Sequence, residues 1–242
     1  MKRLIFTAAI LLTFGATGFC GDPYTHFAQN ITADGMKPFA KDLGAILGSG
    51  LYTSGRSLGF SGFDLGVRGA AVFSPSRGNV VVEKSGTDTA WMPWVQGEIG
   101  MPFRLDGFVR AYSNNGLTMA GGGLRWGITE LNTKPYAFQS MIVVAGHAAS
   151  HQSFSAVHVS ANLVSSLNGV WYVPYIGVGV DRTKLTVTEA DAQEIDGSVV
   201  STTQPRGVLG ITFRPWQFMY FGVAGNFLSG QTAFSSDMGV RF

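Results

Sequence analysis

Charged side chains are scarce in this chain of 242 residues. Asp, Glu, Lys and Arg together make up 13% of it, about half of the usual share in soluble domains. The formal net charge of +2 is too small to indicate nucleic acid or another strongly charged partner. Cysteine occurs once, at Cys20, so an internal disulfide is excluded.

Long apolar runs are also missing. After residue 20 no run approaches the roughly 20 residues that a membrane-spanning helix requires, although 45% of the residues are hydrophobic. High apolarity without such a helix leaves two classes of protein. One is a soluble β protein with a buried core, and the other is a membrane barrel whose strands alternate apolar and polar residues.

The N-terminus has the pattern of a secretory signal peptide, assigned to residues 1–20. Lys2 and Arg3 precede the apolar run Leu4–Phe14, and small residues follow, a run too short for a stable span. Cleavage after Gly18 and cleavage after Cys20 both stay open. Acylation of Cys20 is the less favoured alternative, because the residues before it fit a lipidation motif poorly.

From residue 61 onward the chain reads as short alternating segments separated by turn residues. Glycine (33 residues) and aromatic residues (12%) are frequent throughout. In Phe63–Phe73, for example, Leu65 and Val67 alternate with Asp64 and Arg68. The pattern predicts ten strands: Phe63–Phe73, Trp91–Met101, Leu105–Tyr112, Leu117–Ile128, Tyr136–His147, Ser153–Leu167, Val170–Val187, Arg206–Arg214, Phe218–Leu228 and Ala233–Phe242.

The connections between these segments alternate in length. Those expected at one end are brief, while the two longest, 74–90 and 188–203, fall at the other end. In a membrane barrel the long connections are extracellular and the short turns periplasmic. Aromatic residues near the expected rims suit the interface of a membrane: Trp91, Trp94, Trp126, Tyr136, Tyr172, Trp216 and Tyr220.

The final segment, Phe234–Phe242, alternates strictly and finishes on Phe242. It resembles the closing strand of bacterial outer-membrane β-barrels, in which the barrel-assembly machinery recognises the C-terminal aromatic residue. We therefore predict one transmembrane, antiparallel, up-and-down β-barrel of about ten strands, with twelve as the alternative, over residues 61–242. The resemblance implies the outer membrane of a Gram-negative-type bacterium, with outer-membrane lipid and the assembly machinery as partners and Phe242 as the assembly signal.

Residues 21–60 do not read as strands. Met36–Leu47 predicts a short amphipathic helix, with Pro38 in its first turn and a Gly-rich link after it. Such a helix either enters the lumen as a plug or lies against the periplasmic rim. The Pro-Phe-x-x-x-Leu-Gly helix of 38–44 and the Gly-Phe-Asp-Leu of 62–65 resemble an uncharacterised group of predicted bacterial outer-membrane proteins, which implies location and fold but no activity.

If the alternation is right, polar residues line the lumen. The expected inward residues are Asp64, Arg68, Glu98, Arg110, Arg125, His158, Ser160, Asn162, Arg206, Arg214, Asp237 and Arg241. Paired charges that fill a narrow barrel are favoured over a cationic pore. Because the first and last strands must pair, Asp64, Arg68, Asp237 and Arg241 are predicted to form an ion-paired cluster beside the seam.

Two further sets of residues are candidate sites. His158, Ser160 and Asn162 loosely resemble the His-x-Ser element of outer-membrane lipid A deacylases, but they are expected to face inward without an acidic residue at matching depth. The carboxylates of the 188–203 connection suit a divalent cation, although solvated loop charges are the favoured interpretation. No catalytic, metal or cofactor site is therefore predicted.

The function expected from the sequence is a narrow pore for passive passage of a small or hydrophobic solute. The alternative is a non-conducting structural or adhesin-like surface barrel. A lipid-modifying enzyme of the outer membrane is the distant third, and the chain is expected not to be an enzyme. The preference for a pore rests on fold analogy alone, since a helix beside a barrel suggests a plug.

Overall fold

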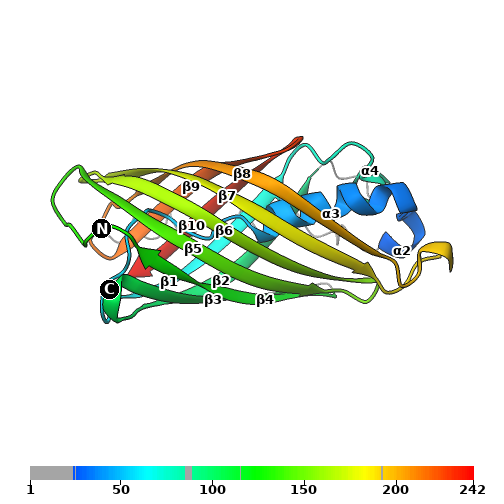
Figure 1. Cartoon of the computed structure of the whole chain (residues 1–242), viewed down its shortest axis with the longest axis horizontal. Coiled ribbons are helices and arrows are strands. Elements are labelled where there is room, and N and C mark those ends of the chain that lie inside the picture. Colours follow the sequence, from blue (N-terminus) through cyan, green and yellow to red (C-terminus); the bar gives the residue numbers. More distant parts are fainter. Residues whose placement is uncertain (1–23, 25, 85–88, 115, 192) are drawn as a thin grey trace, which may run out of the picture.

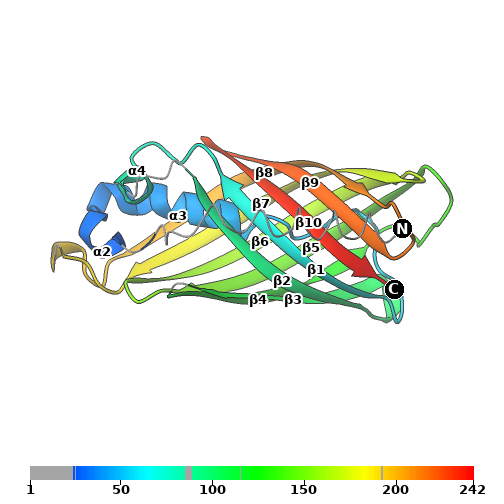
Figure 2. The same ribbon diagram turned by 180° about the vertical axis from the view of Figure 1, so that it is seen from behind.

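The computed structural model of the chain describes residues 24, 26–84, 89–114, 116–191 and 193–242. Within them ten strands form one closed antiparallel barrel, in which sequence neighbours pair and β1 pairs with β10 (Figures 1 and 2). The predicted up-and-down barrel is thus confirmed, with ten strands rather than twelve. The strands are β1 (Phe63–Val72), β2 (Ala90–Gly100), β3 (Leu105–Asn114), β4 (Leu117–Gly127), β5 (Ala137–Ser150), β6 (Phe154–Asn168), β7 (Tyr172–Val187), β8 (Val199–Phe213), β9 (Met219–Leu228) and β10 (Gln231–Arg241).

Among the described residues three helices accompany the barrel: α2 (Phe27–Asn30), α3 (Ala33–Leu47) and α4 (Val80–Lys84). The same residues contain two short 3-10 turns in connections, η1 (Pro102–Arg104) and η2 (Gln193–Ile195). None of the helices in the described part of the chain is long and apolar enough to cross a membrane.

The barrel has two different ends. We call the end at which β1 begins and β10 finishes the C-terminal end, and the opposite one, where α2 and α4 lie, the helical end (Figure 1). The two longest connections, 73–89 and 188–198, both lie at the helical end, as the sequence predicts. The longest connection at the C-terminal end is 128–136.

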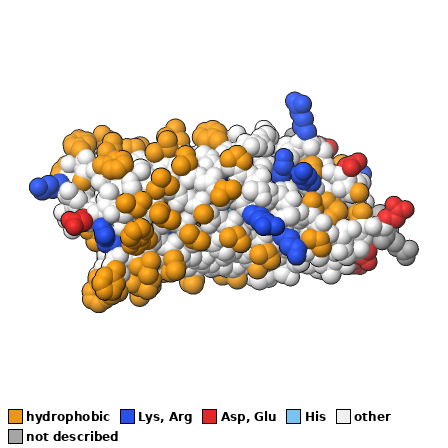
Figure 3. Space-filling model, in the orientation of Figure 1, with side chains coloured by type: hydrophobic (Ala, Val, Ile, Leu, Met, Phe, Trp, Pro, Cys, Tyr) orange, Lys and Arg blue, Asp and Glu red, His pale blue; other side chains and the backbone are white. Residues whose placement is uncertain are grey.

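Alternation separates the two faces of the wall. In β1 the side chains of Asp64 and Arg68 are buried, while those of Leu65 and Val67 are about half exposed. Because the interior of a closed barrel is enclosed, the buried set lies inside and the exposed apolar set covers the outside. Apolar side chains cover much of the visible face, and a group of Lys and Arg side chains stands toward the helical end (Figure 3).

α3 runs from the helical end into the barrel, and residues 48–58 continue toward the C-terminal end, where β1 begins (Figures 1 and 2). We call residues 33–58 the luminal segment. Of the two positions predicted for the helix, plug or periplasmic rim, the structure has the first. Met36, Phe39, Leu43 and Ile46 are all buried, which accounts for the amphipathic spacing in the sequence.

Some predicted boundaries are wrong. α3 begins at Ala33 rather than Met36, because the Thr32 side chain accepts a hydrogen bond from the Gly35 amide (3.1 Å) and caps the helix. β8 begins at Val199 rather than Arg206. Its first seven residues pair with β7 but extend past β9, whose pairing begins at Arg206 opposite Leu228. Pro205 is tolerated there because one side of the strand is an edge.

Two of the predicted rim aromatic residues point inward. Trp94 and Tyr220 are each 2% exposed. Trp94 lies under the Arg110 guanidinium, and the Tyr220 hydroxyl donates to Asp64 (2.7 Å). Both positions fall on the inner face of their strand, so register overrides the general preference of Trp and Tyr for an interface.

Candidate functional site: the filled lumen

Arginine side chains from the barrel wall hold the end of α3. The carbonyls of Gly44 and Ala45 accept from the Arg206 Nη2 (3.3 and 3.1 Å), and the carbonyl of Leu47 accepts from Arg110. The last four carbonyls of a helix have no partner within it, and the C-terminus carries partial negative charge. The Gly44 carbonyl also accepts from the Gly48 amide (2.9 Å) and the Ala45 carbonyl from the Ser49 hydroxyl (2.7 Å). The arginines therefore add to these bonds, supply a donor to the Leu47 carbonyl and match the helix dipole.

The same arrangement continues along the extended part of the luminal segment. The Ser49 carbonyl accepts from Arg110 (2.9 Å) and the Gly50 carbonyl from Arg68 (2.7 Å), while the Leu51 carbonyl accepts from Arg125. Further along, Thr212 donates to the Thr53 carbonyl (2.7 Å). A buried backbone must find partners, and for these residues the wall supplies them.

Glu98 is the central anion of this set. Its carboxylate forms ion pairs with Arg68 on β1 and Arg125 on β4, and all three side chains are buried. Gln96 also donates to Glu98 (2.8 Å). Full pairing and hydrogen bonding are what make charge tolerable at this depth.

Arg206 has its own anion, Asp181 of β7, which accepts from the Arg206 Nε at 2.7 Å. Asn226 accepts from the same guanidinium (2.9 Å). By contrast, Arg110 has no carboxylate within ion-pair distance among the described residues. It donates to two carbonyls and lies 4.9 Å from the centre of the Trp94 ring.

The predicted seam cluster forms in part. Asp64 lies opposite Arg241 and Arg68 opposite Asp237 where β1 meets β10. Asp64 and Arg241 form an ion pair at 2.8 Å, as predicted. Arg68, however, pairs with Glu98 of β2 rather than with Asp237, and Asp237 Oδ1 has no hydrogen-bond partner among the described residues.

His158, Ser160 and Asn162 are all buried on the inner face of β6. The expectation that no acidic residue matches their depth is wrong. Asp181 lies opposite Ser160 in the register, and its Oδ1 is 4.0 Å from His158 Nε2. His158 Nδ1 is instead hydrogen-bonded to Thr183 (2.9 Å), and the Ser160 hydroxyl has no described partner. The histidine therefore contacts the Thr183 hydroxyl and not the serine of the predicted His-x-Ser element.

The remaining predicted residues lie away from this centre. Arg214, just after β8, is half-buried and donates to Asn168 (3.4 Å) at the C-terminal end. Phe242 is 74% exposed, and its backbone pairs with that of Phe63 (2.9 and 2.8 Å). Within the described residues no group of three or more His, Cys, Asp or Glu side chains is arranged to hold a metal ion.

Apolar packing fills the rest of the lumen. Toward the helical end Phe27, Phe39 and Phe154 pack with ring centroids 4.7–5.2 Å apart. Farther inside, Leu51 and Tyr52 join a second buried apolar cluster with residues of the wall. The luminal segment is thus a packed core element of the barrel.

A polar network ties the luminal segment to the helical end. Asp42 of α3 accepts from the Ser76 amide (2.9 Å) and from Asn79 Nδ2 (2.6 Å), both in the connection after β1. Burial raises the pKa of the Asp42 carboxyl, and these hydrogen bonds oppose that rise. The network fastens α3 to the connection that covers it.

The chain was compared with known proteins. No protein-family model and no curated protein matches it, so the resemblance to an uncharacterised group of outer-membrane proteins stays a prediction. Among solved structures it is similar to the N-terminal β-barrel domain of Pseudomonas aeruginosa OprF (11% identity, TM-score 0.40, covering 76% of this chain and 99% of that one). It is also similar to Neisserial surface protein A (13%, 0.32, 74% and 95%) and to Ail of Yersinia pestis (12%, 0.27, 76% and 99%). At these scores the similarities assign no activity, and the barrel topology stands on the strand register of the chain itself.

Proposed function

We propose that this chain is a bacterial outer-membrane β-barrel that is closed by its own luminal segment and acts as a non-conducting structural or surface-recognition protein. The membrane location is supported by the outer wall, where alternate residues such as Leu65, Val109 and Ile176 are exposed and apolar. Exposed aromatic side chains gather near the C-terminal end, as expected at an interface: Phe60, Phe103, Tyr136, Trp171, Tyr172, Trp216, Phe218 and Phe242.

The observation that carries the non-conducting role is the filled lumen. Wall arginines bind successive carbonyls of the luminal segment, and Leu43, Ile46, Leu47 and Leu51 are 0–2% exposed. A ten-stranded barrel is little wider than eight-stranded barrels, whose side chains alone fill the interior. Ions therefore have no open path along this axis unless the segment moves.

Gated passage of a small solute is the second candidate. It is favoured by buried polar groups of the wall that make no hydrogen bond to the described residues, among them both ring nitrogens of His147 and the side-chain amide of Asn162. Such groups suit a wall that faces water when the luminal segment is displaced.

Planar-bilayer conductance tests both candidates. We expect the full chain to remain at baseline after it is shown to fold by its heat-dependent mobility on gels. A variant lacking residues 30–58 loses the packing that fills the lumen, so we expect it to show steps of conductance once it is shown to fold in the same way. Steps from the full chain contradict the closed barrel and favour gated passage, and a folded deletion variant at baseline contradicts closure by the luminal segment.

Assembly of this barrel is proposed to use β10 and Phe242. β10 closes the seam with β1, and the Phe242 ring is exposed where the assembly machinery and outer-membrane lipid can contact it. We expect deletion of Phe242 to lower the amount of protein in the outer-membrane fraction several-fold. An unchanged amount contradicts this role.

A further inference from the structure

The strands on one side of the barrel are shorter than those on the other side. β5 to β8 have 14–16 residues, whereas β9, β10 and β1 have 10 or 11. Because Arg206 of β8 pairs with Leu228 at the end of β9, β8 continues for seven residues beyond the β9–β10 hairpin. The N-terminal half of α3 extends beyond the tip of that hairpin (Figure 2).

A basic cavity of about 620 Å³ opens above the hairpin. α3 contributes Lys37 and Lys41, the connection after β1 contributes Ser76 and Arg77, and the hairpin tip contributes Ser229 and Gly230. None of the three cations forms an ion pair with a described residue. The nearest buried carboxylate, Asp42, accepts from Ser76 and Asn79 and does not line the cavity. Three positive charges therefore share one cavity whose lining contains no carboxylate, although Asp42 behind the lining partly offsets the charge of Lys41.

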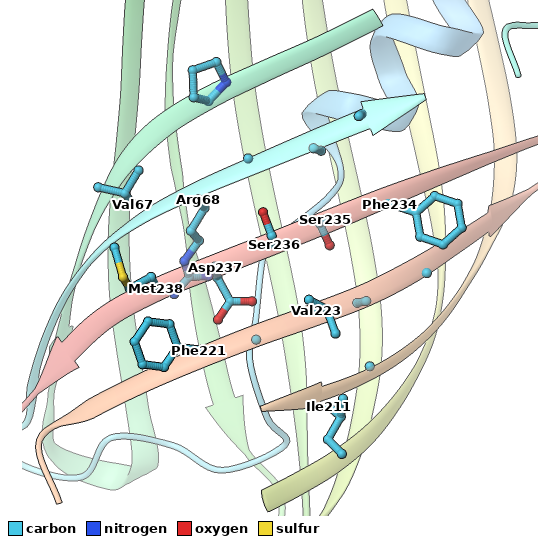
Figure 4. Close-up of a pocket in the computed structure, with 18 of the residues that line it drawn as sticks. Val67, Arg68, Ile211, Phe221, Val223, Phe234, Ser235, Ser236, Asp237 and Met238 are labelled. Atoms are coloured by element: carbon cyan, nitrogen blue, oxygen red, sulfur yellow. The ribbon is translucent and has the colours of Figure 1, made fainter. Parts of the chain in front are cut away.

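An apolar groove lies on the outer wall below this cavity. It crosses β2, β1, β10, β9 and β8, with a volume of about 1250 Å³ (Figure 4). Its lining includes short residues such as Gly69, Gly225 and Ser236 and the rings of Phe73, Phe221 and Phe234. Polar atoms contribute little to the exposed lining, so the groove suits a hydrocarbon chain.

The basic cavity and the apolar groove are neighbours, because both are lined by residues near the end of β1 and the start of β10. Phe73 of the groove precedes Arg77 by four residues, and Phe234 follows Gly230 by four residues. Four extended residues span about 13 Å. An anionic headgroup and an attached acyl chain fit such an arrangement, because charge attraction and hydrocarbon burial act on adjacent parts of one molecule.

We propose that the basic cavity and the apolar groove together bind a phosphorylated, acylated lipid of the membrane leaflet at the helical end. The phosphate lies among Lys37, Lys41 and Arg77, and an acyl chain lies in the groove against Gly225 and Ser236. The site rests on the proposed membrane location. A free phosphate ion would use the basic cavity alone, and an uncharged lipid would use the groove alone.

Native mass spectrometry of the full chain in detergent, with bis-phosphorylated lipid A as the probe, tests the site. One variant removes the charges (Lys37→Gln, Lys41→Gln, Arg77→Gln), and a second fills the groove (Ser236→Phe). The matched controls are Arg182→Gln with Lys184→Gln, which removes exposed charges of β7, and Ala161→Phe, which adds a ring to the exposed face of β6. We expect each site variant to retain roughly tenfold less lipid, and the controls to retain as much as the original chain.

Three results overturn the proposal. The first is a loss of lipid from the β7 control as large as that from the site variants, which indicates general attraction by charge. The second is retention of dephosphorylated lipid A by the original chain as strong as that of bis-phosphorylated lipid A. The third is displacement of the lipid by inorganic phosphate at the lipid's own concentration. A chain that does not insert as a folded barrel into phosphatidylcholine vesicles contradicts the membrane location instead, so the two failures are distinguishable.

Discussion

At the scale of single residues, the filled lumen depends on charged side chains of the wall that bind backbone carbonyls of the luminal segment. Arg110 and Arg206 donate to carbonyls at the C-terminal end of α3, and Arg68 and Arg125 both donate to the luminal segment and share Glu98. The arginines therefore stabilise the filled state twice, through ion pairs within the wall and through hydrogen bonds to the luminal segment.

Replacing Glu98 by Gln tests this arrangement. The change leaves two buried guanidinium groups without their shared anion, so we expect the free energy of unfolding to fall by about 3–5 kcal/mol. Urea titration in lipid vesicles, followed by tryptophan fluorescence, measures it. Glu130→Gln in an exposed connection is the control and is expected to change nothing. A Glu98 variant as stable as the control contradicts the role of this anion.

At the scale of elements, the luminal segment fits the wall closely. A β-carbon at Gly55 would lie 2.5 Å from the Gln139 carbonyl oxygen and 3.0 Å from the Ser166 amide nitrogen. Both atoms belong to the backbone of paired strands, β5 and β6, and they cannot move aside as a flexible side chain does. Only glycine therefore fits at position 55, where the luminal segment contacts the wall.

Gly55→Val should consequently displace the segment. We expect the free energy of unfolding to fall by roughly 1–3 kcal/mol, as for other overpacked sites, measured by the same urea titration. The control is Gly146→Val on the outer face of β5, where a β-carbon meets nothing within 4 Å. Equal stability of the two variants would show that the segment is not held against the wall at residue 55.

At the scale of the whole molecule, the fold places α2 and the start of α3 at the end opposite to Phe242 (Figure 1). The short connections at the C-terminal end predict that this end lies in the periplasm, which would place α2 and the start of α3 on the outside of the cell. The luminal segment then runs through the barrel from outside to inside before β1 begins.

Cysteine labelling tests this orientation. In a Cys20→Ser background, we expect a membrane-impermeant maleimide to label Asp34→Cys on intact cells and to leave Asn132→Cys, in the β4–β5 connection, unlabelled until the outer membrane is opened. Both residues are exposed. Labelling of Asn132→Cys alone on intact cells reverses the orientation.

The sequence by itself determined the class of fold. Alternation has period two, so Leu65 and Val67 had to share one face and Asp64 and Arg68 the other, whatever the barrel around them. The order of short and long connections follows from the same pattern, as does the Asp64–Arg241 ion pair once the first and last strands pair.

Only the tertiary structure decided the partners across the lumen. Register between strands is not written in one strand alone, so Asp181 opposite Ser160 could not be read from spacing. Arg68 pairs with Glu98 although Asp237 lies opposite it in the register, so the direction of its side chain decided this partner. The position of the helix was also undecided, because an amphipathic stripe specifies burial and not the surface that provides it. The lumen accommodates the segment because wall arginines donate there to the carbonyls of residues 44, 45, 47, 49, 50 and 51.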